Sequence, residues 1–183
     1  MGRSKKSVTK RLVMSAVFVA LGLIMPFITM QIQSIGNMLL PMHIPVLLCG
    51  FLCGAPYGVL VGAIVPVFRS MLFGMPVMMP MAVGMSFELA AYGLISGLLY
   101  SVLADKKFGT YIALLGAMFT GRAVWGLVSC VLYRILGNVF TWELFMAGAL
   151  FNAIPGIIIQ LAVIPVLVNT LARARLTVPV NEG

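Results

Sequence analysis

Long apolar segments separated by short breaks dominate the chain. The breaks carry Pro, Gly, polar or charged residues, and the apolar stretches between them predict six helices, at 11–29, 45–54, 57–73, 80–103, 108–136 and 143–171. A transmembrane helix needs about 20 predominantly apolar residues to cross the hydrocarbon core. Irregular backbone at membrane depth survives only inside protein, so the breaks belong at the membrane interfaces. The pattern predicts an all-α integral membrane protein with six transmembrane helices in a single domain, residues 1–183.

The segment 45–54 does not fit this scheme by itself. About ten residues at a rise of 1.5 Å each cannot cross a core of roughly 30 Å. In one interpretation, 45–54 and 57–73 form a single span interrupted at Pro56, which gives five spans. In the other, the short helix is extended by the proline-containing loop before it, which gives six. The distribution of charge favours the second.

Composition and charge add the membrane orientation. The chain is 62% hydrophobic and 9% charged, whereas soluble proteins average about 45–50% and about 25%. Of 12 Lys and Arg residues, nine lie in the first eleven residues, in the break 104–107 or near the C-terminus. Basic residues in short loops mark the cytoplasmic side. We therefore expect an even number of spans and both termini in the cytoplasm, with a basic segment 1–11 and a tail 172–183. No aromatic and basic interleaving suggests nucleic-acid binding.

Two ionisable residues lie inside predicted helices. Glu88 and Arg122 each carry a cost of roughly 2.5–3.5 kcal/mol on insertion scales, so such residues usually pair or line a cavity. A structural ion pair between the two helices and a ligand contact are both open. Helical spacing places further side chains beside them: Met81, Met85, Tyr92 and Ser96 with Glu88, and Trp125 and Ser129 with Arg122.

These faces predict a small-molecule pocket in an apolar enclosure that opens to the outside. On helix 143–171, Asn152 and Gln160 add amides beside Pro155-Gly156. Arg69 and His43 fall at the outer rim, where snorkelling to headgroups and loop packing between two prolines are the plain alternatives. The candidate substrate-binding residues are His43, Arg69, Met85, Glu88, Tyr92, Arg122, Trp125 and Asn152.

Small residues form two patterns. Glycine recurs every four residues at Gly50, Gly54, Gly58 and Gly62, which predicts a seam of close helix packing. The first helix holds a pair at the same spacing, Ala16 and Ala20, whose groove suits a bundle neighbour or another protein. Three cysteines in apolar surroundings lack the further ligands of a metal site. We expect no metal and no cofactor.

Enzymatic classes are disfavoured. The chain has no Walker sequence, so it does not use ATP in the P-loop manner. A single Asp, a single His and dispersed Glu residues do not form the carboxylate pair or metal cluster of membrane proteases and head-group transferases. Transport then needs a partner or a gradient. A self-sufficient carrier or channel remains an alternative, although the two related halves common in carriers are not found.

Several of these residues together resemble a known family. The basic N-terminus, Ala16-x-x-x-Ala20, the segment Leu40-Pro41-Met42-His43-Ile44-Pro45 and the run Gly54-Ala55-Pro56-Tyr57-Gly58 are similar to S components of energy-coupling factor (ECF) vitamin transporters. The resemblance implies a six-helix monomer that binds a vitamin or precursor near the extracellular side of a bacterial or archaeal cell membrane. It also implies a transmembrane coupling subunit, in contact with Ala16 and Ala20, and two cytoplasmic ATPase subunits. The chain itself would be a binding protein, not an enzyme.

The resemblance extends to one branch. The segments Pro66–Pro76, Phe87–Gly93 and Gly121–Gly126 look like the branch labelled as pantothenate transporters. Pantothenate is an anion with hydroxyls and an amide, so Arg122 or Arg69 would bind its carboxylate. A pyridoxine-like or hydroxymethylpyrimidine ligand stays open, with Trp125 and Tyr92 stacking on the ring and Glu88 meeting a ring nitrogen.

Overall fold

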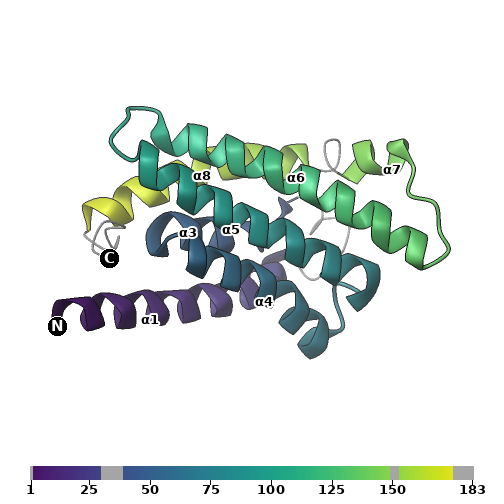
Figure 1. Ribbon diagram of the computed structural model, residues 1–183, viewed down its shortest axis with the longest axis horizontal. Helices are drawn as coiled ribbons and strands as arrows, with labels where there is room; N and C mark the ends of the chain where they lie inside the picture. Colours follow the sequence, from purple (N-terminus) through teal and green to yellow (C-terminus); the bar gives the residue numbers. More distant parts are fainter. Residues whose placement is uncertain (1, 30–38, 149–152, 175–183) are drawn as a thin grey trace.

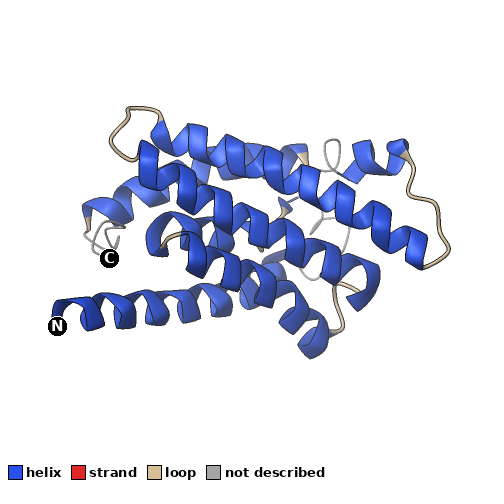
Figure 2. Ribbon diagram, in the orientation of Figure 1, coloured by secondary structure: helices blue, strands red, loops and turns tan. Residues whose placement is uncertain are grey.

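The computed structural model of the chain describes residues 2–29, 39–148 and 153–174, and every regular element in these ranges is helical (Figure 1, Figure 2). The elements are α1 (Gly2–Ile24), η1 (Met25–Thr29), α3 (His43–Cys53), α4 (Ala55–Phe73), η2 (Met78–Ala82), α5 (Val83–Leu103), α6 (Gly109–Ile135), α7 (Trp142–Met146) and α8 (Ile154–Arg173). The predicted all-α class is confirmed for this part of the chain.

Five of the described helical segments are long and apolar enough to cross a membrane: Ser7–Ile28, Ala55–Phe73, Met78–Leu103, Gly109–Ile135 and Ile154–Arg173. The sixth, α3, has 11 residues, which gives it a length of roughly 16 Å at 1.5 Å per residue. All of its residues are buried, and it packs against α1, α4, α5 and α8. The predicted short helix is therefore enclosed by the bundle, where its backbone is shielded from lipid without spanning the core.

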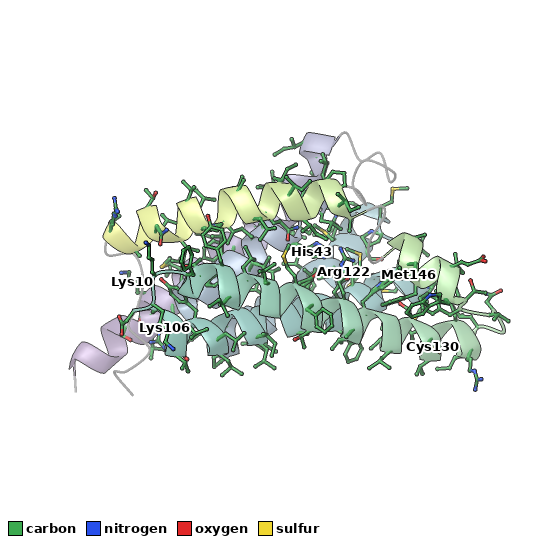
Figure 3. All side chains as sticks on the ribbon, turned by 90° about the horizontal axis from the view of Figure 1, so that it is seen from above. Lys10, His43, Lys106, Arg122, Cys130 and Met146 are labelled. Atoms are coloured by element: carbon green, nitrogen blue, oxygen red, sulfur yellow. The ribbon has the colours of Figure 1, made fainter. Side chains whose placement is uncertain are left out.

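The ends of the described chain lie together. The start of α1, the turn between α5 and α6 and the end of α8 share one end of the molecule (Figure 1). Lys10 and Lys106 are at that end, while Cys130 and Met146 are near the other (Figure 3). This arrangement is what the positive-inside rule requires of the basic segments. Their location in the cytoplasm stays a prediction.

The predicted helix over 143–171 lies partly outside the described residues. Within it the structure has α7, which ends at Met146, and α8, which begins at Ile154, and residues 149–152 between them are not described. Pro155 lies in the first turn of α8, a position that proline tolerates because that N–H needs no helical partner. Deeper inside a helix, its ring would clash with a carbonyl of the preceding turn. A start of α8 at Ile154 therefore suits Pro155.

Glycines bring α3, α4 and α5 together. A Cβ on Gly93 of α5 would overlap the backbone of Gly58 on α4, and one on Gly50 of α3 would approach the Gly93 carbonyl oxygen at 2.7 Å. Gly62 meets the Leu89 backbone in the same way, so the predicted seam is confirmed at these positions. Gly54 differs: its φ of 94° forms the turn between α3 and α4, and its Cβ position is open. The close approach places α5 directly beside α3.

Candidate functional site

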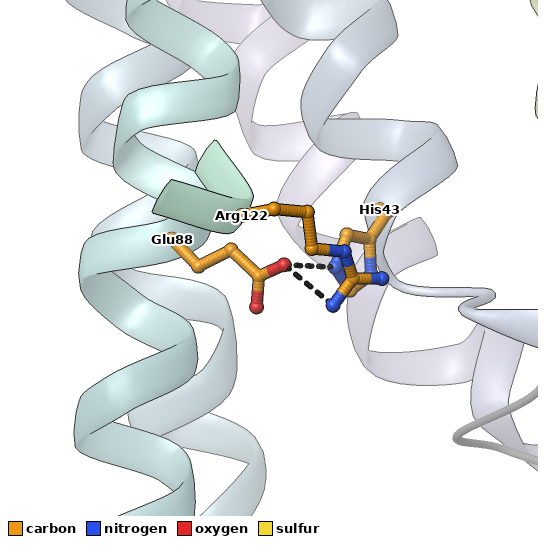
Figure 4. A network of polar contacts seen from close by, with 3 residues as sticks. All are labelled: His43, Glu88 and Arg122. Carbon is orange, nitrogen blue, oxygen red and sulfur yellow. Dashed lines mark ion pairs between the residues drawn. The ribbon is translucent and has the colours of Figure 1, made fainter. Parts of the chain in front are cut away.

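Three titratable side chains from three helices meet inside the bundle. Glu88 Oε1 on α5 lies 3.0 Å from an Nη1 of Arg122 on α6 and 3.5 Å from Nε2 of His43 on α3 (Figure 4). The exposed fractions are 2% for Glu88, 1% for His43 and 14% for Arg122. A buried charge is stable only when paired. The structure therefore brings together Glu88 and Arg122, as expected, and adds His43 to them.

The depth of this cluster follows from helix lengths. Arg122 lies in the middle of α6, and Glu88 lies one and a half turns into α5. Because α3 runs only roughly 16 Å from its turn at Gly54, its first residue, His43, lies part-way along the bundle, beside Arg122 and between the Lys10 and Met146 ends (Figure 3). The prediction of His43 at the outer rim was wrong. It assumed that the helix beginning near His43 crosses the whole membrane, whereas α3 has only 11 residues.

Much of the polar capacity of the cluster is unused. Among the described residues, neither ring nitrogen of His43 and neither Nε nor Nη2 of Arg122 has a hydrogen-bond partner. Gln160 on α8 is fully buried, and both atoms of its amide group also lack one. An unmet buried polar group costs roughly 1–3 kcal/mol. Such groups are usual where a ligand completes the hydrogen bonding, and here N–H donors are in excess.

Tyr92 supports the cluster from the next turn of α5. Its ring meets that of His43 edge to face, with centroids 5.2 Å apart, and its hydroxyl interacts with Glu88. On the other side, a Cβ on Gly121 would come within 3.1 Å of the Tyr92 ring. The glycine therefore leaves room for the ring one residue before Arg122. Met85, one turn away from Glu88 in the opposite direction, is partly buried against the core.

Arg69 is not part of this cluster. It is 3% exposed, and its Nη1 donates to the Leu23 carbonyl at 2.8 Å. Its guanidinium lies 5.3 Å from the Phe27 ring centroid and 5.4 Å from that of Phe73. Pro26 has no N–H to donate to the carbonyls of the preceding turn, so an acceptor is available there. Arg69 is thus buried between α4 and the end of α1 rather than directed toward headgroups.

The aromatic residues gather elsewhere. Trp125 contacts Phe140 and Phe145, with ring centroids 5.8 and 6.2 Å away. Next to it is an apolar cavity of about 460 Å³, lined by Ala123, Gly126, Leu127, Cys130, Phe140, Thr141, Trp142 and Phe145. No Lys, Arg, His, Asp or Glu lines this cavity, so its size alone does not make it the polar site. Asn152, the remaining candidate, lies outside the described residues.

The alanine pair occupies the surface of α1. Ala16 and Ala20 are exposed, whereas Ser15, Phe18 and Gly22 on the same helix are buried toward the bundle. Exposed apolar neighbours of the pair include Val13, Val17, Leu21 and Ile24. The small groove therefore faces away from the rest of the chain, as is required of a surface for another protein.

Sequence reasoning placed Gln160 on a face of the predicted pocket but not among the candidate binding residues, and it missed the joining of His43 to Glu88. One signal was present for His43: it lies 11 residues before Gly54, so a helix that starts at that glycine turn would carry it only part-way across a bilayer. For Gln160 the signal was weak, since an amide in a predicted span is compatible both with a position at the lipid interface and with a buried position.

Apolar helices of spanning length around a buried polar cluster define a multi-pass membrane protein with an interior polar site. The family described as "ECF transporter, substrate-specific component" matches residues 10–168. The chain belongs to this family, whose members are substrate-binding transporter subunits and not enzymes. No curated protein and no solved structure matches it.

Proposed function

We propose that this chain is the binding subunit of an ECF-type vitamin importer and that it captures a small water-soluble vitamin or precursor from the extracellular side. The observation that supports this most directly is that buried polar atoms of His43, Arg122 and Gln160 have no hydrogen-bond partner among the described residues. A purely structural ion pair needs only Glu88 and Arg122 and gives no reason for the additional buried donors. A ligand that supplies acceptors would give those donors partners.

Pantothenate is the leading ligand candidate. Its carboxylate suits the free Nε and Nη2 of Arg122, because two parallel N–H donors recognise a carboxylate with both charge and geometry. Its amide and hydroxyls suit Gln160 and His43, and Asn152 is a further proposed contact. A pyridoxine-like or hydroxymethylpyrimidine ligand would instead place a ring nitrogen at Glu88 and its ring near Tyr92. Arg69 then acts as a link between α1 and α4 rather than as a ligand contact.

The proposed assembly follows from the exposed face of α1. Ala16 and Ala20 would contact a transmembrane coupling subunit, and two ATPase subunits would hydrolyse ATP on the side of the basic segments. Small residues let two helices approach closely in a membrane, where packing rather than hydrophobicity drives association. The N- and C-termini would face the cytoplasm of a bacterium or archaeon. The helices α1, α3, α4, α5, α6 and α8 would alternate in direction in the membrane, with α3 as the short one that reaches only part of the way across.

Ligand binding is tested first by native mass spectrometry of the full chain released gently from detergent. We expect an adduct with the mass of a vitamin, and thermal stabilisation by pantothenate if the chain purifies empty. Liposomes that contain the chain alone should show no gradient-driven pantothenate flux. Flux without partner subunits would identify a self-sufficient carrier and overturn the proposal.

Partner contact is tested with Ala16→Trp and Ala20→Trp. Both variants should bind ligand like the wild type yet lose uptake when the coupling and ATPase subunits are co-expressed. Ala162→Trp on α8 is the matched control, since Ala162 is also an exposed alanine on a spanning helix. Normal uptake by the α1 variants would show that the coupling subunit binds elsewhere.

A further inference from the structure

We infer that a carboxylate ligand enters this site together with one proton, and that His43 carries the proton. The inference rests on the proposed binding function and adds the charge of the ligand and the pH dependence of its binding. It follows from the buried position of the cluster, from the number of charges in it and from His43, whose Nε2 lies 3.5 Å from Glu88 Oε1 and whose Nδ1 has no partner among the described residues.

The empty site is electrically balanced when His43 is neutral. Arg122 contributes one positive charge and Glu88 one negative charge, and the two lie 3.0 Å apart with little exposure to solvent. Arginine keeps its charge in proteins. A proton on His43 alone would leave the buried cluster with a net positive charge. A carboxylate alone would leave it with a net negative charge.

The two additions compensate each other. An isolated charge in a low-dielectric interior is strongly unfavourable, whereas a close pair of opposite charges is tolerated. A carboxylate at the free Nε and Nη2 of Arg122 would share the guanidinium with Glu88. A proton on His43 restores neutrality at the same place. Binding of the anion and uptake of the proton are therefore coupled.

The geometry assigns the proton to His43 rather than to Glu88. The His43 Nε2 lies 3.5 Å from Glu88 Oε1, so protonation would give this carboxylate a second cationic neighbour. Both ring nitrogens would then be donors: Nε2 toward Glu88, and Nδ1, which now has no partner among the described residues, for the ligand. A proton on Glu88 would instead remove the charge that holds Arg122.

No other described titratable group replaces His43 in this role. Around α3, the helix α5 contributes Glu88 and Tyr92, and α6 contributes Arg122 through the ion pair. On α4, Arg69 is bonded to the Leu23 carbonyl, and Tyr57 is near the opposite end of that helix. The remaining groups lie further from His43, toward the basic end of the bundle: Lys10 and Arg11 on α1, Cys49 and Cys53 further along α3, Tyr100 on α5, which contacts Phe51, and Arg173 on α8.

Isothermal titration calorimetry on the full chain in nanodiscs tests this coupling. Pantothenate and panthenol form a matched pair of probes, because panthenol has a neutral alcohol where pantothenate has the carboxylate. Titrations in buffers of different ionisation enthalpy count the protons taken up. We expect about one proton with pantothenate and about none with panthenol under conditions where His43 is neutral. In that range, each unit by which the pH is raised should lower the affinity for pantothenate by up to about tenfold, because the proton must be taken from a more dilute pool.

Two variants identify the residue that takes up the proton. His43→Gln should remove both the proton uptake and the pH dependence of pantothenate binding. Glu88→Gln leaves Arg122 to balance the ligand, so pantothenate should bind it without a proton. Pantothenate binding without proton uptake by the wild type would overturn the inference even if a variant does not fold, and uptake retained by His43→Gln would overturn the assignment to His43.

A thermal-shift screen of the full chain with pantothenate and with neutral vitamins separates this inference from the proposed function. If a neutral vitamin such as pyridoxine stabilises the chain and carboxylates do not, the carboxylate and the proton are wrong while the binding function stands. If no vitamin in the screen binds, both are wrong.

Discussion

The pair formed by Glu88 and Arg122 offers the sharpest test of whether this site is structural, ligand-binding or both. The perturbation is a set of three variants, Glu88→Gln, Arg122→Gln and the double variant. Each single change removes one charge and leaves the other buried, whereas the double variant removes both. Glutamine keeps hydrogen-bonding capacity and approximate size, so the set isolates the charges.

The magnitude follows from the observed distance. At 3.0 Å, two unit charges attract by roughly 5 kcal/mol at an effective dielectric constant of about 20. Breaking a buried pair from one side typically costs about 3–5 kcal/mol. The proximity of His43, at 3.5 Å, lowers the cost for Arg122→Gln, since its protonation would partly replace the lost charge. We expect unfolding free energies to fall by about 4 kcal/mol in Glu88→Gln and by about 3 kcal/mol in Arg122→Gln, with a coupling energy of about 2–3 kcal/mol from the double variant.

The assay is equilibrium unfolding in bicelles, titrated with a denaturing detergent, together with ligand affinity measured on the folded fraction. A double variant that is less destabilised than the sum of the single variants indicates direct pairing. Additive losses would refute the pairing. For function, Arg122→Gln should weaken pantothenate binding by at least about tenfold after correction for folding, as expected for a lost charged hydrogen bond. If the affinity is unchanged after that correction, the pair of Glu88 and Arg122 has a structural role and Arg122 does not bind the ligand.

Three further variants test other parts of the structure. Gly93→Ala should destabilise the fold by about 1–3 kcal/mol because the added methyl overlaps Gly58, whereas Gly84→Ala on the same helix, where the nearest atom is 3.6 Å away, should not; equal unfolding free energies would argue against the seam. Arg69→Met should cost about 1–3 kcal/mol in the same unfolding assay by removing the charged hydrogen bond to a carbonyl of α1, and it should leave affinity nearly unchanged. Gln160→Leu should stabilise the empty protein by about 1 kcal/mol and weaken pantothenate binding in calorimetry, whereas lost stability with normal affinity would assign the amide a packing role.

The elements themselves were largely predictable. The described helices follow the predicted ones to within a few residues for the segments 57–73, 80–103 and 108–136, because hydropathy, Pro and Gly act locally along a membrane span. Helix 143–171 contains most of α7 and, apart from its last two residues, α8, and residues 149–152 between them lie outside the described ranges. The choice between five and six spans could not be settled from the sequence, because the length of α3 does not show whether lipid or protein surrounds it.

The candidate site was predictable in part. Glu88 and Arg122 stood out because a charge inside a span is costly wherever it lies. Arg69 has the same chemistry but a different role, which depends on a carbonyl from α1 and two phenyl rings that no pattern within α4 could indicate. His43 joined the cluster only once the depth of α3 was known.

From residue type and order alone it follows that this chain lies in a membrane and approximately where its helices run. These properties depend on residue type and on order along the chain, since transfer to lipid is additive over neighbouring residues. Only the tertiary structure decided which polar groups meet, which of them remain without partners and which small residues face outward. Those outcomes depend on distances between helices, and a few ångströms there separate an ion pair from a single buried charge.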